Sequence, residues 1–171
     1  MKLHSRQEIQ NILLNFKPSL CRTQFMKRDF EQHIRIMFTH EMQIRVRYGD
    51  TDKMGYVYYG NYPYYYEIAR AEAIRALGVS YKSIEDTGVV MPVTRMNIKY
   101  IQPAFYDELL TIKVTIPELP GRIIVFNYEV INETGKRLNE GETCLIFLDT
   151  KTNLVTRTPE ILLEKLKPFF E

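Results

Sequence analysis

Residues 61–78 read NYPYYYEIARAEAIRALG, and this stretch decides the fold. Asn61 is a good N-cap, Pro63 is accepted in the first turn of a helix, and Gly78 suits the position just after its end. We therefore predict a helix over residues 62–77. Its charged residues are spread around it: Glu67, Arg70, Glu72 and Arg75. The other positions are mostly tyrosine, isoleucine, leucine and alanine, and a helix that is apolar most of the way round is a buried one.

Segments on both sides of this helix alternate apolar and polar residues, which is the pattern of half-buried strands. In the first segment Met42, Ile44 and Val46 alternate with polar neighbours. The predicted strands are residues 41–47, 92–100, 110–116, 124–130 and 138–148. A second, short helical piece is predicted at about 81–87. Thr158 is expected to cap a final helix that has Pro159 at its first position.

Tight turns join the later strands. Residues 118–121 (ELPG) and 132–135 (NETG) are both well suited to hairpins. Short connections of this kind imply an antiparallel sheet. A sheet that must cover one largely apolar helix is expected to curl around it. The predicted class is therefore α+β, with an antiparallel sheet wrapped around a long central helix.

The first part of the chain differs in composition from the rest. Residues 1–38 are rich in Arg, Lys, Gln and His, and Ile9, Leu13 and Phe16 have the spacing of a short amphipathic helix. We divide the chain into an N-terminal extension, residues 1–38, whose status we leave open, and a domain, residues 39–171. No apolar run has the length of a membrane span and no signal peptide is recognised, so we expect a cytoplasmic protein.

Charge and histidine content exclude several classes of function. A net charge of +2 over 171 residues gives no reason to expect binding to nucleic acid or a membrane surface. All three histidines, His4, His33 and His40, precede the first confident strand segment, so no residue from Glu41 onward can supply the imidazole of a Ser-His-Asp or Cys-His arrangement or of a paired-histidine zinc motif. The sequence contains neither the Gly-x-Gly-x-x-Gly motif of dinucleotide-binding folds nor the Gly-x4-Gly-Lys-[Ser/Thr] motif of a P-loop. We expect no metal and no cofactor.

Acidic groups crowd the loop before the central helix, where residues 48–55 read YGDTDKMG. A helix N-terminus presents unpaired backbone N–H groups that polarise a carbonyl and hold developing negative charge. A carboxylate beside such groups suits acyl transfer without histidine. Spacing alone, however, favours an ordinary aspartate-rich turn.

The segments 45–62 (RVRYGDTDKMGYVYYGNY) and 96–109 (MNIKYIQPAFYDEL) resemble the 4-hydroxybenzoyl-CoA thioesterase family. The resemblance is greatest to its branch associated with the Tol–Pal system, and it covers residues 39–170. It implies the hotdog fold, in which an antiparallel sheet wraps a long helix. It also implies an acyl-CoA thioesterase, a homodimer or homotetramer with active sites between subunits, that releases a free carboxylic acid and CoA.

The resemblance assigns roles to particular residues. It implies that Asp52 is catalytic, as a nucleophile or as a general base, and that the backbone N–H of Tyr59 polarises the thioester carbonyl. Tyr48 matches a recurring tyrosine near the site. Substrate contacts are implied at Asn61, at Tyr62 and, for the CoA phosphates, at Arg122. The Tol–Pal branch has histidine where this chain has Tyr59, so only the backbone role transfers.

Asp50 and Glu67 are the other acidic residues that could act at the site. We interpret Asp50 as a structural residue of the loop, and Glu67 as the partner of Arg70 in a helix ion pair rather than as a base. Most of the tyrosine cluster is expected in the core and subunit interface. The alternatives are an acyl-carrier-protein thioesterase, a non-catalytic acyl-CoA-binding protein and a dehydratase, which ranks low because residues from Glu41 onward contain no histidine.

Overall fold

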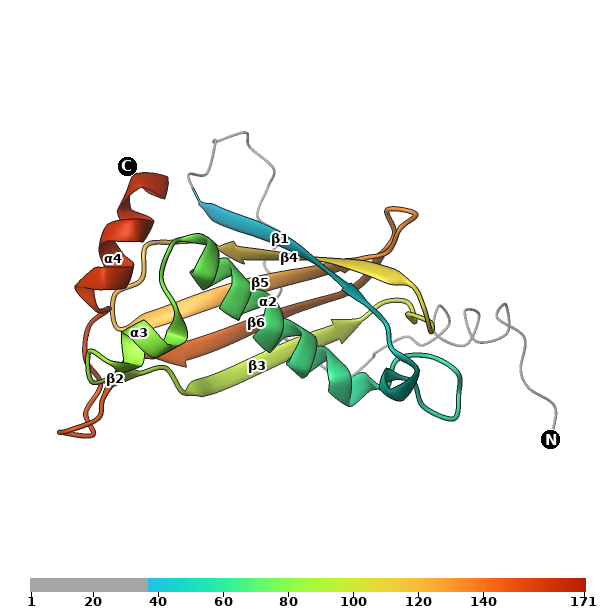
Figure 1. Cartoon of the computed structure of the whole chain (residues 1–171), viewed down its shortest axis with the longest axis horizontal. Coiled ribbons are helices and arrows are strands. Elements are labelled where there is room, and N and C mark those ends of the chain that lie inside the picture. The colour runs from blue at the N-terminus through green and yellow to red at the C-terminus, as the bar shows by residue number, and fades with distance from the viewer. Residues whose placement is uncertain (1–36) are drawn as a thin grey trace, which may run out of the picture. The chain divides into compact units, whose positions relative to one another are not determined.

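The computed structural model describes residues 37–171, and the predictions made for residues 1–36 lie outside this part of the chain. Its main feature is a five-stranded sheet with the strand order β1-β4-β5-β6-β3, in which every neighbouring pair is antiparallel. The helix α2 lies along one face of this sheet (Figure 1). The predicted α+β class, with an antiparallel sheet and one long helix, is confirmed.

The bounds of the elements agree with the predicted segments to within three residues. The first strand begins earlier than predicted and contains His40, so the prediction that all three histidines precede it is wrong for His40. The strands of the sheet are β1 (Phe38–Arg45), β3 (Val93–Tyr100), β4 (Leu109–Ile116), β5 (Ile123–Ile131) and β6 (Arg137–Ile146). A second, two-stranded sheet pairs β2 (Val89–Val90) with β7 (Leu148–Asp149). The helices are α2 (Tyr62–Ala76), α3 (Tyr81–Glu85) and α4 (Glu160–Leu166), with short 3₁₀ turns η1 (Tyr48–Asp50), η2 (Tyr59–Asn61) and η3 (Lys167–Phe169). The segment predicted as one strand over 138–148 is divided at the buried Phe147.

Alternation along the strands places one apolar face against α2. Every second residue of β4 and β5 is fully buried: Leu110, Ile112, Val114, Ile116, Ile124, Phe126, Tyr128 and Val130. Because side chains alternate between the two faces of a sheet, these residues form one continuous surface. The helix contributes Tyr65, Tyr66, Ala69 and Ala73 to the same core.

The central helix departs from its prediction in two ways. It ends as expected, with Gly78 in the left-handed region at φ +79°, where glycine carries no steric cost. Asn61, however, has helical backbone angles and makes no side-chain cap, because its amide Nδ2 donates to the carbonyl oxygen of Asp50 instead. The helix is also buried on one side only, and Tyr64 and Glu67 are exposed, because a single sheet covers a single side.

The last helix is capped differently from the prediction. Pro159, not Thr158, occupies the N-cap position of α4. The Thr158 hydroxyl lies within hydrogen-bond distance of the carbonyl oxygens of Pro120 and Gly121, at 2.9 and 2.8 Å. Thr158 therefore ties the approach to α4 to the turn between β4 and β5.

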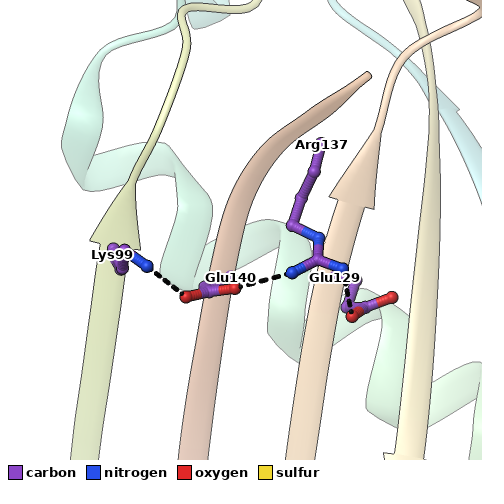
Figure 2. Close-up of polar contacts among 4 residues, drawn as sticks. All are labelled: Lys99, Glu129, Arg137 and Glu140. Atoms are coloured by element: carbon purple, nitrogen blue, oxygen red, sulfur yellow. Dashed lines mark hydrogen bonds and ion pairs between the residues drawn. The ribbon is translucent and has the colours of Figure 1, made fainter. Parts of the chain in front are cut away.

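The outer face of the sheet carries a line of alternating charges. Glu140 accepts from Lys99 Nζ at 2.8 Å and from an Arg137 guanidinium nitrogen at 3.1 Å, and Arg137 also pairs with Glu129 at 3.2 Å (Figure 2). Burial opposes ionisation of Glu140, but Lys99 and Arg137 outweigh it and lower the pKa of this carboxyl. These pairs link β3, β6 and β5 on the face opposite α2.

Replacing Glu140 with glutamine is expected to lower the free energy of unfolding at pH 7 by about 0.5–1 kcal/mol, because its partners Lys99 and Arg137 are exposed and solvent screens the pairs. A carboxyl with a lowered folded-state pKa stabilises the protein above its unfolded-state pKa of about 4.3, and this contribution is lost as the pH falls through the folded value. Urea unfolding at several pH values should show parent and variant converging in acid. A difference that is as large at about pH 3 as at pH 7 would contradict this account.

No helix within residues 37–171 is long and apolar enough to cross a membrane.

Candidate active site

The loop between β1 and α2 is fastened to the segment between β3 and β4. Val57 N donates to the Ala104 carbonyl at 2.9 Å, and Tyr56 forms an isolated bridge with Phe105. At the start of the loop, Val46 N donates to the Glu108 carbonyl at 3.0 Å. The structure thus brings together the two sequence segments that carry the family resemblance.

Asp50 is the polar centre of this loop. Its Oδ2 accepts from the backbone N–H of Arg47 and from the Tyr65 hydroxyl, both at 2.8 Å. Its carbonyl oxygen accepts from Tyr58 N at 2.9 Å and from Asn61 Nδ2 at 2.8 Å. Burial, together with the Asp50 carboxylate, raises the pKa of Tyr65. These bonds agree with the structural role predicted for Asp50.

We expect Asp50→Ala to lower the free energy of unfolding by about 1–3 kcal/mol, since it leaves the buried Tyr65 hydroxyl without an acceptor. In a Tyr65→Phe background the same change should cost less, because no orphaned hydroxyl remains. Chemical denaturation of the four proteins of this cycle measures the coupling. Equal costs in both backgrounds would show that the Asp50–Tyr65 bond does not stabilise the loop.

Asp52 lies two residues further on and is only half-buried. Its Oδ1 accepts from Met54 N at 2.8 Å, while its backbone N–H donates to the Tyr56 carbonyl at 3.0 Å. The other carboxylate oxygen accepts no hydrogen bond within residues 37–171. Burial, and then the Asp52 charge, raise the pKa of Tyr56. Within the described part of the chain, the carboxylate is thus held by one oxygen, and the other has no hydrogen-bond partner.

The turn η2 follows directly and leads into α2. Within the described residues, neither the Tyr59 nor the Gly60 backbone N–H donates a hydrogen bond. The pKa of Tyr58 is raised mainly by the adjacent Tyr59 hydroxyl, with a smaller contribution from Asp52. Among residues 37–171, the start of η2 therefore presents two backbone N–H groups that have no hydrogen-bond partner.

The other residues predicted near the site, Tyr48, Tyr62 and Asn61, differ in how exposed they are and in what they contact. Tyr48 is 81% exposed and packs edge-to-face on Tyr106, with ring centroids 5.9 Å apart. Tyr62 is buried, 3% exposed, and its ring contacts those of Tyr65 and Tyr100. Asn61 is engaged with Asp50. Tyr62 and Asn61 therefore both have structural contacts within this chain.

Arg122 is not brought to the loop within one chain. It is exposed and immediately precedes β5, whose residue Ile123 pairs with Ile146. The loop lies instead at the end of β3 where Tyr100 pairs with Asn139. Ile146 and Asn139 are separated along β6 by roughly 23 Å at about 3.3 Å per residue.

The predicted Glu67–Arg70 ion pair is wrong. Arg70 Nε instead donates to the Tyr81 hydroxyl at 2.9 Å, because α3 packs beside α2 at that turn. The pair of this spacing that forms on the helix is Glu72–Arg75. In the described part of the chain, no group of three or more His, Cys, Asp or Glu residues could hold a metal ion.

Two residues near the loop were not singled out from the sequence. The Tyr100 hydroxyl donates to the Tyr59 carbonyl oxygen at 3.1 Å. Asn139, fully buried on β6, accepts from the Tyr66 hydroxyl, while its Nδ2 has no partner among residues 37–171. The available signals were a tyrosine at the end of one predicted strand and an amide at an inward position of another.

Comparison with known proteins gives consistent matches. The sequence model of the thioesterase superfamily matches residues 54–138. YneP of Bacillus subtilis is 36% identical over 100 residues, which are 58% of this chain and 72% of YneP. YbgC of Escherichia coli is 34% identical over 106 residues, 62% of this chain and 79% of YbgC.

A solved structure points to the same family as these two relatives. The DHNA-CoA thioesterase from Staphylococcus aureus is 36% identical and has a TM-score of 0.66, over 70% of this chain and 80% of that one. The chain therefore belongs to the thioesterase superfamily, as a hotdog-fold thioester hydrolase of the YbgC-like family.

Proposed function

We propose that the chain hydrolyses acyl-CoA thioesters to a free carboxylic acid and CoA, with Asp52 as the catalytic carboxylate. The observation that carries this proposal is that, within residues 37–171, one Asp52 oxygen accepts no hydrogen bond and the Tyr59 N–H, further along the same loop, donates none. The name of YbgC, acyl-CoA thioester hydrolase, supports the substrate class. So does the name of the S. aureus structure, which is also a CoA thioesterase.

The proposed reaction places the thioester carbonyl oxygen at the Tyr59 N–H. Backbone donors at the start of α2 would stabilise the negative charge that develops on this oxygen. Asp52 then either attacks the carbonyl carbon, forming a mixed anhydride as the CoA thiolate leaves, or removes a proton from the water that attacks. In both routes water completes the hydrolysis, and the thiolate ends as the CoA thiol.

The two routes differ in the oxygen that enters the product. In a single turnover in ¹⁸O-labelled water, acid without the label identifies Asp52 as the nucleophile, because the new oxygen then came from its carboxylate. A general-base route gives only acid that carries one labelled oxygen. Mass spectrometry of the peptide that contains Asp52, after several turnovers, measures ¹⁸O in its carboxylate. The nucleophile route predicts labelled Asp52, and the general-base route predicts none.

We further propose that two copies of the chain complete each site. The edge strand β3 has no partner on its outer side within the described chain, and Val93 and Tyr100, near its two ends, are 43% and 46% exposed. Two such edges paired antiparallel would place Tyr100 of one copy near Val93 of the other. Arg122 of the second copy would then lie roughly three strand spacings, about 15 Å, from Tyr100 of the first, within reach of CoA phosphates. The assembly is a homodimer or a pair of such dimers.

A complementation experiment tests the shared site. Asp52→Asn and Arg122→Glu variants are each expected to be weakly active alone. After unfolding and refolding together, about half of the dimers are mixed, and each mixed dimer has one intact site, so roughly a quarter of parent activity should return. If Asp52 and Arg122 of the same chain formed the site, mixing would restore nothing.

The substrate class is tested by thiol release from short, long and aromatic acyl-CoAs, with the matching acyl carrier proteins run in parallel. We expect hydrolysis of CoA esters and inhibition by free CoA. Hydrolysis of the carrier-protein esters alone would overturn the CoA assignment. Binding without hydrolysis of either would overturn the catalytic one.

A further inference from the structure

Tyr100 connects the edge of the sheet to the turn in front of α2. Its hydroxyl donates to the Tyr59 carbonyl oxygen at 3.1 Å. Its ring meets that of Tyr59 edge-on at a centroid distance of 6.4 Å, and that of Tyr62 at 5.5 Å. The phenol therefore has two separable contacts, a hydrogen bond through its oxygen and packing through its ring.

The Tyr59 carbonyl oxygen, which accepts the bond from Tyr100, belongs to the same peptide unit as the Gly60 N–H. The Tyr59 carbonyl and the Gly60 N–H form one planar peptide group, and this N–H has no partner within residues 37–171. Hydrogen bonding to a carbonyl polarises the N–H of the same peptide and strengthens it as a donor. Tyr100 thus acts on the electronics and on the orientation of this group.

The peptide needs such a restraint because Gly60 is conformationally free. A Cβ atom at this position would lie 2.6 Å from a ring carbon of Tyr58, so that exposed ring would have to turn aside. The Asn61 N–H donates to the Tyr58 carbonyl at 2.9 Å and closes the turn from the other side. The Tyr100 bond fixes the plane of the intervening peptide.

We propose that Tyr100 is a positioning residue that holds the Tyr59–Gly60 peptide so that the N–H groups of η2 face the carbonyl of the bound thioester. This inference rests on the proposed function, because it assumes that the thioester binds at η2. It adds Gly60 N–H to the donors of the site. Tyr100 itself does not touch the reacting atoms.

The test is Tyr100→Phe, which removes the hydroxyl and retains the ring. We expect kcat to fall about tenfold, the size expected for one hydrogen bond that matters more in the transition state than in the bound substrate. KM and the melting temperature should stay close to those of the parent. The matched control is Tyr64→Phe, which removes an exposed phenol of α2 that has no hydrogen bond in the described chain and should leave kcat unchanged.

Amide hydrogen exchange of the peptide covering residues 58–62 provides a readout that does not depend on activity. Exchange in Tyr100→Phe should be faster than in the parent and in Tyr64→Phe. Equal exchange in all three proteins overturns the inference, as does a parent-like kcat in Tyr100→Phe.

The two proposals fail in distinguishable ways. If the parent hydrolyses acyl-CoA and Asp52→Asn does not, a parent-like Tyr100→Phe overturns only the role of Tyr100. A parent that hydrolyses no acyl-CoA overturns the proposed function, and the exchange measurement then decides whether Tyr100 holds the turn. If the fall in kcat of Tyr100→Phe is accompanied by a clear fall in its melting temperature, the positioning role is overturned in favour of a purely structural one.

Discussion

Asp52→Asn is expected to lower kcat by about 10² to 10⁴-fold, the range for loss of a positioned acid or base. The variant removes the negative charge but keeps an oxygen that can accept from Met54 N, the one hydrogen bond that the described residues make to this side chain. The loop should therefore stay folded, with an unchanged melting temperature and oligomeric state. Initial rates of thiol release at saturating acyl-CoA measure the effect.

The matched control is Asp86→Asn, which changes an exposed carboxylate just after α3. It should retain the parent rate. An Asp52→Asn protein that turns over at the parent rate would contradict the assignment of the catalytic carboxylate. Equal losses in both variants would instead indicate a general sensitivity to charge.

Gly141→Ala is expected to lower the free energy of unfolding by about 2–3 kcal/mol, the upper part of the range for overpacking a core. A Cβ atom at this position would lie 2.5–2.8 Å from three atoms of the Tyr66 side chain. Tyr66 has little freedom to move away. It is fully buried and stacks on Tyr128 at a centroid distance of 4.1 Å, and its hydroxyl donates to Asn139.

Thermal unfolding should show the cost of Gly141→Ala as a decrease of about 5–10 °C in Tm for a chain of this size. Gly60→Ala is the control, since its Cβ would approach Tyr58 at 2.6 Å, but that ring is 43% exposed and has room to turn outward. Its cost should be below about 1 kcal/mol, as for ordinary surface changes. A Gly141→Ala protein as stable as the parent would mean that Tyr66 repacks.

Local sequence patterns predicted the elements well because each element has its own periodicity. The alternation of Leu110, Ile112, Val114 and Ile116 reappears as the buried face of β4, and Gly78 ends the central helix. The capping residues were less predictable. Asn61 and Thr158 both have side chains suited to caps, but each donates to a carbonyl of a segment distant in sequence, Asp50 and the 120–121 turn.

The neighbours of Asp52 and Tyr59 depend on how the strands are ordered in the sheet. Tyr100 ends β3, which directly precedes β4 along the chain. In the sheet, however, β3 lies at the edge and pairs with β6. Nothing in the local pattern of residues 92–100 specifies this partner, because register and strand order depend on long-range contacts. The Tyr100–Tyr59 bond was therefore beyond the reach of spacing arguments. The roles of Asp52, Tyr59 and Arg122 stay predictions.

The measurement that tests the central claim most directly is release of free CoA from a panel of acyl-CoAs by the parent and by Asp52→Asn, assayed side by side. The account predicts steady hydrolysis of at least one ester by the parent and a rate at least about 10²-fold lower in the variant. Equal rates in the two proteins, or no release of CoA from any ester by the folded parent, would contradict it.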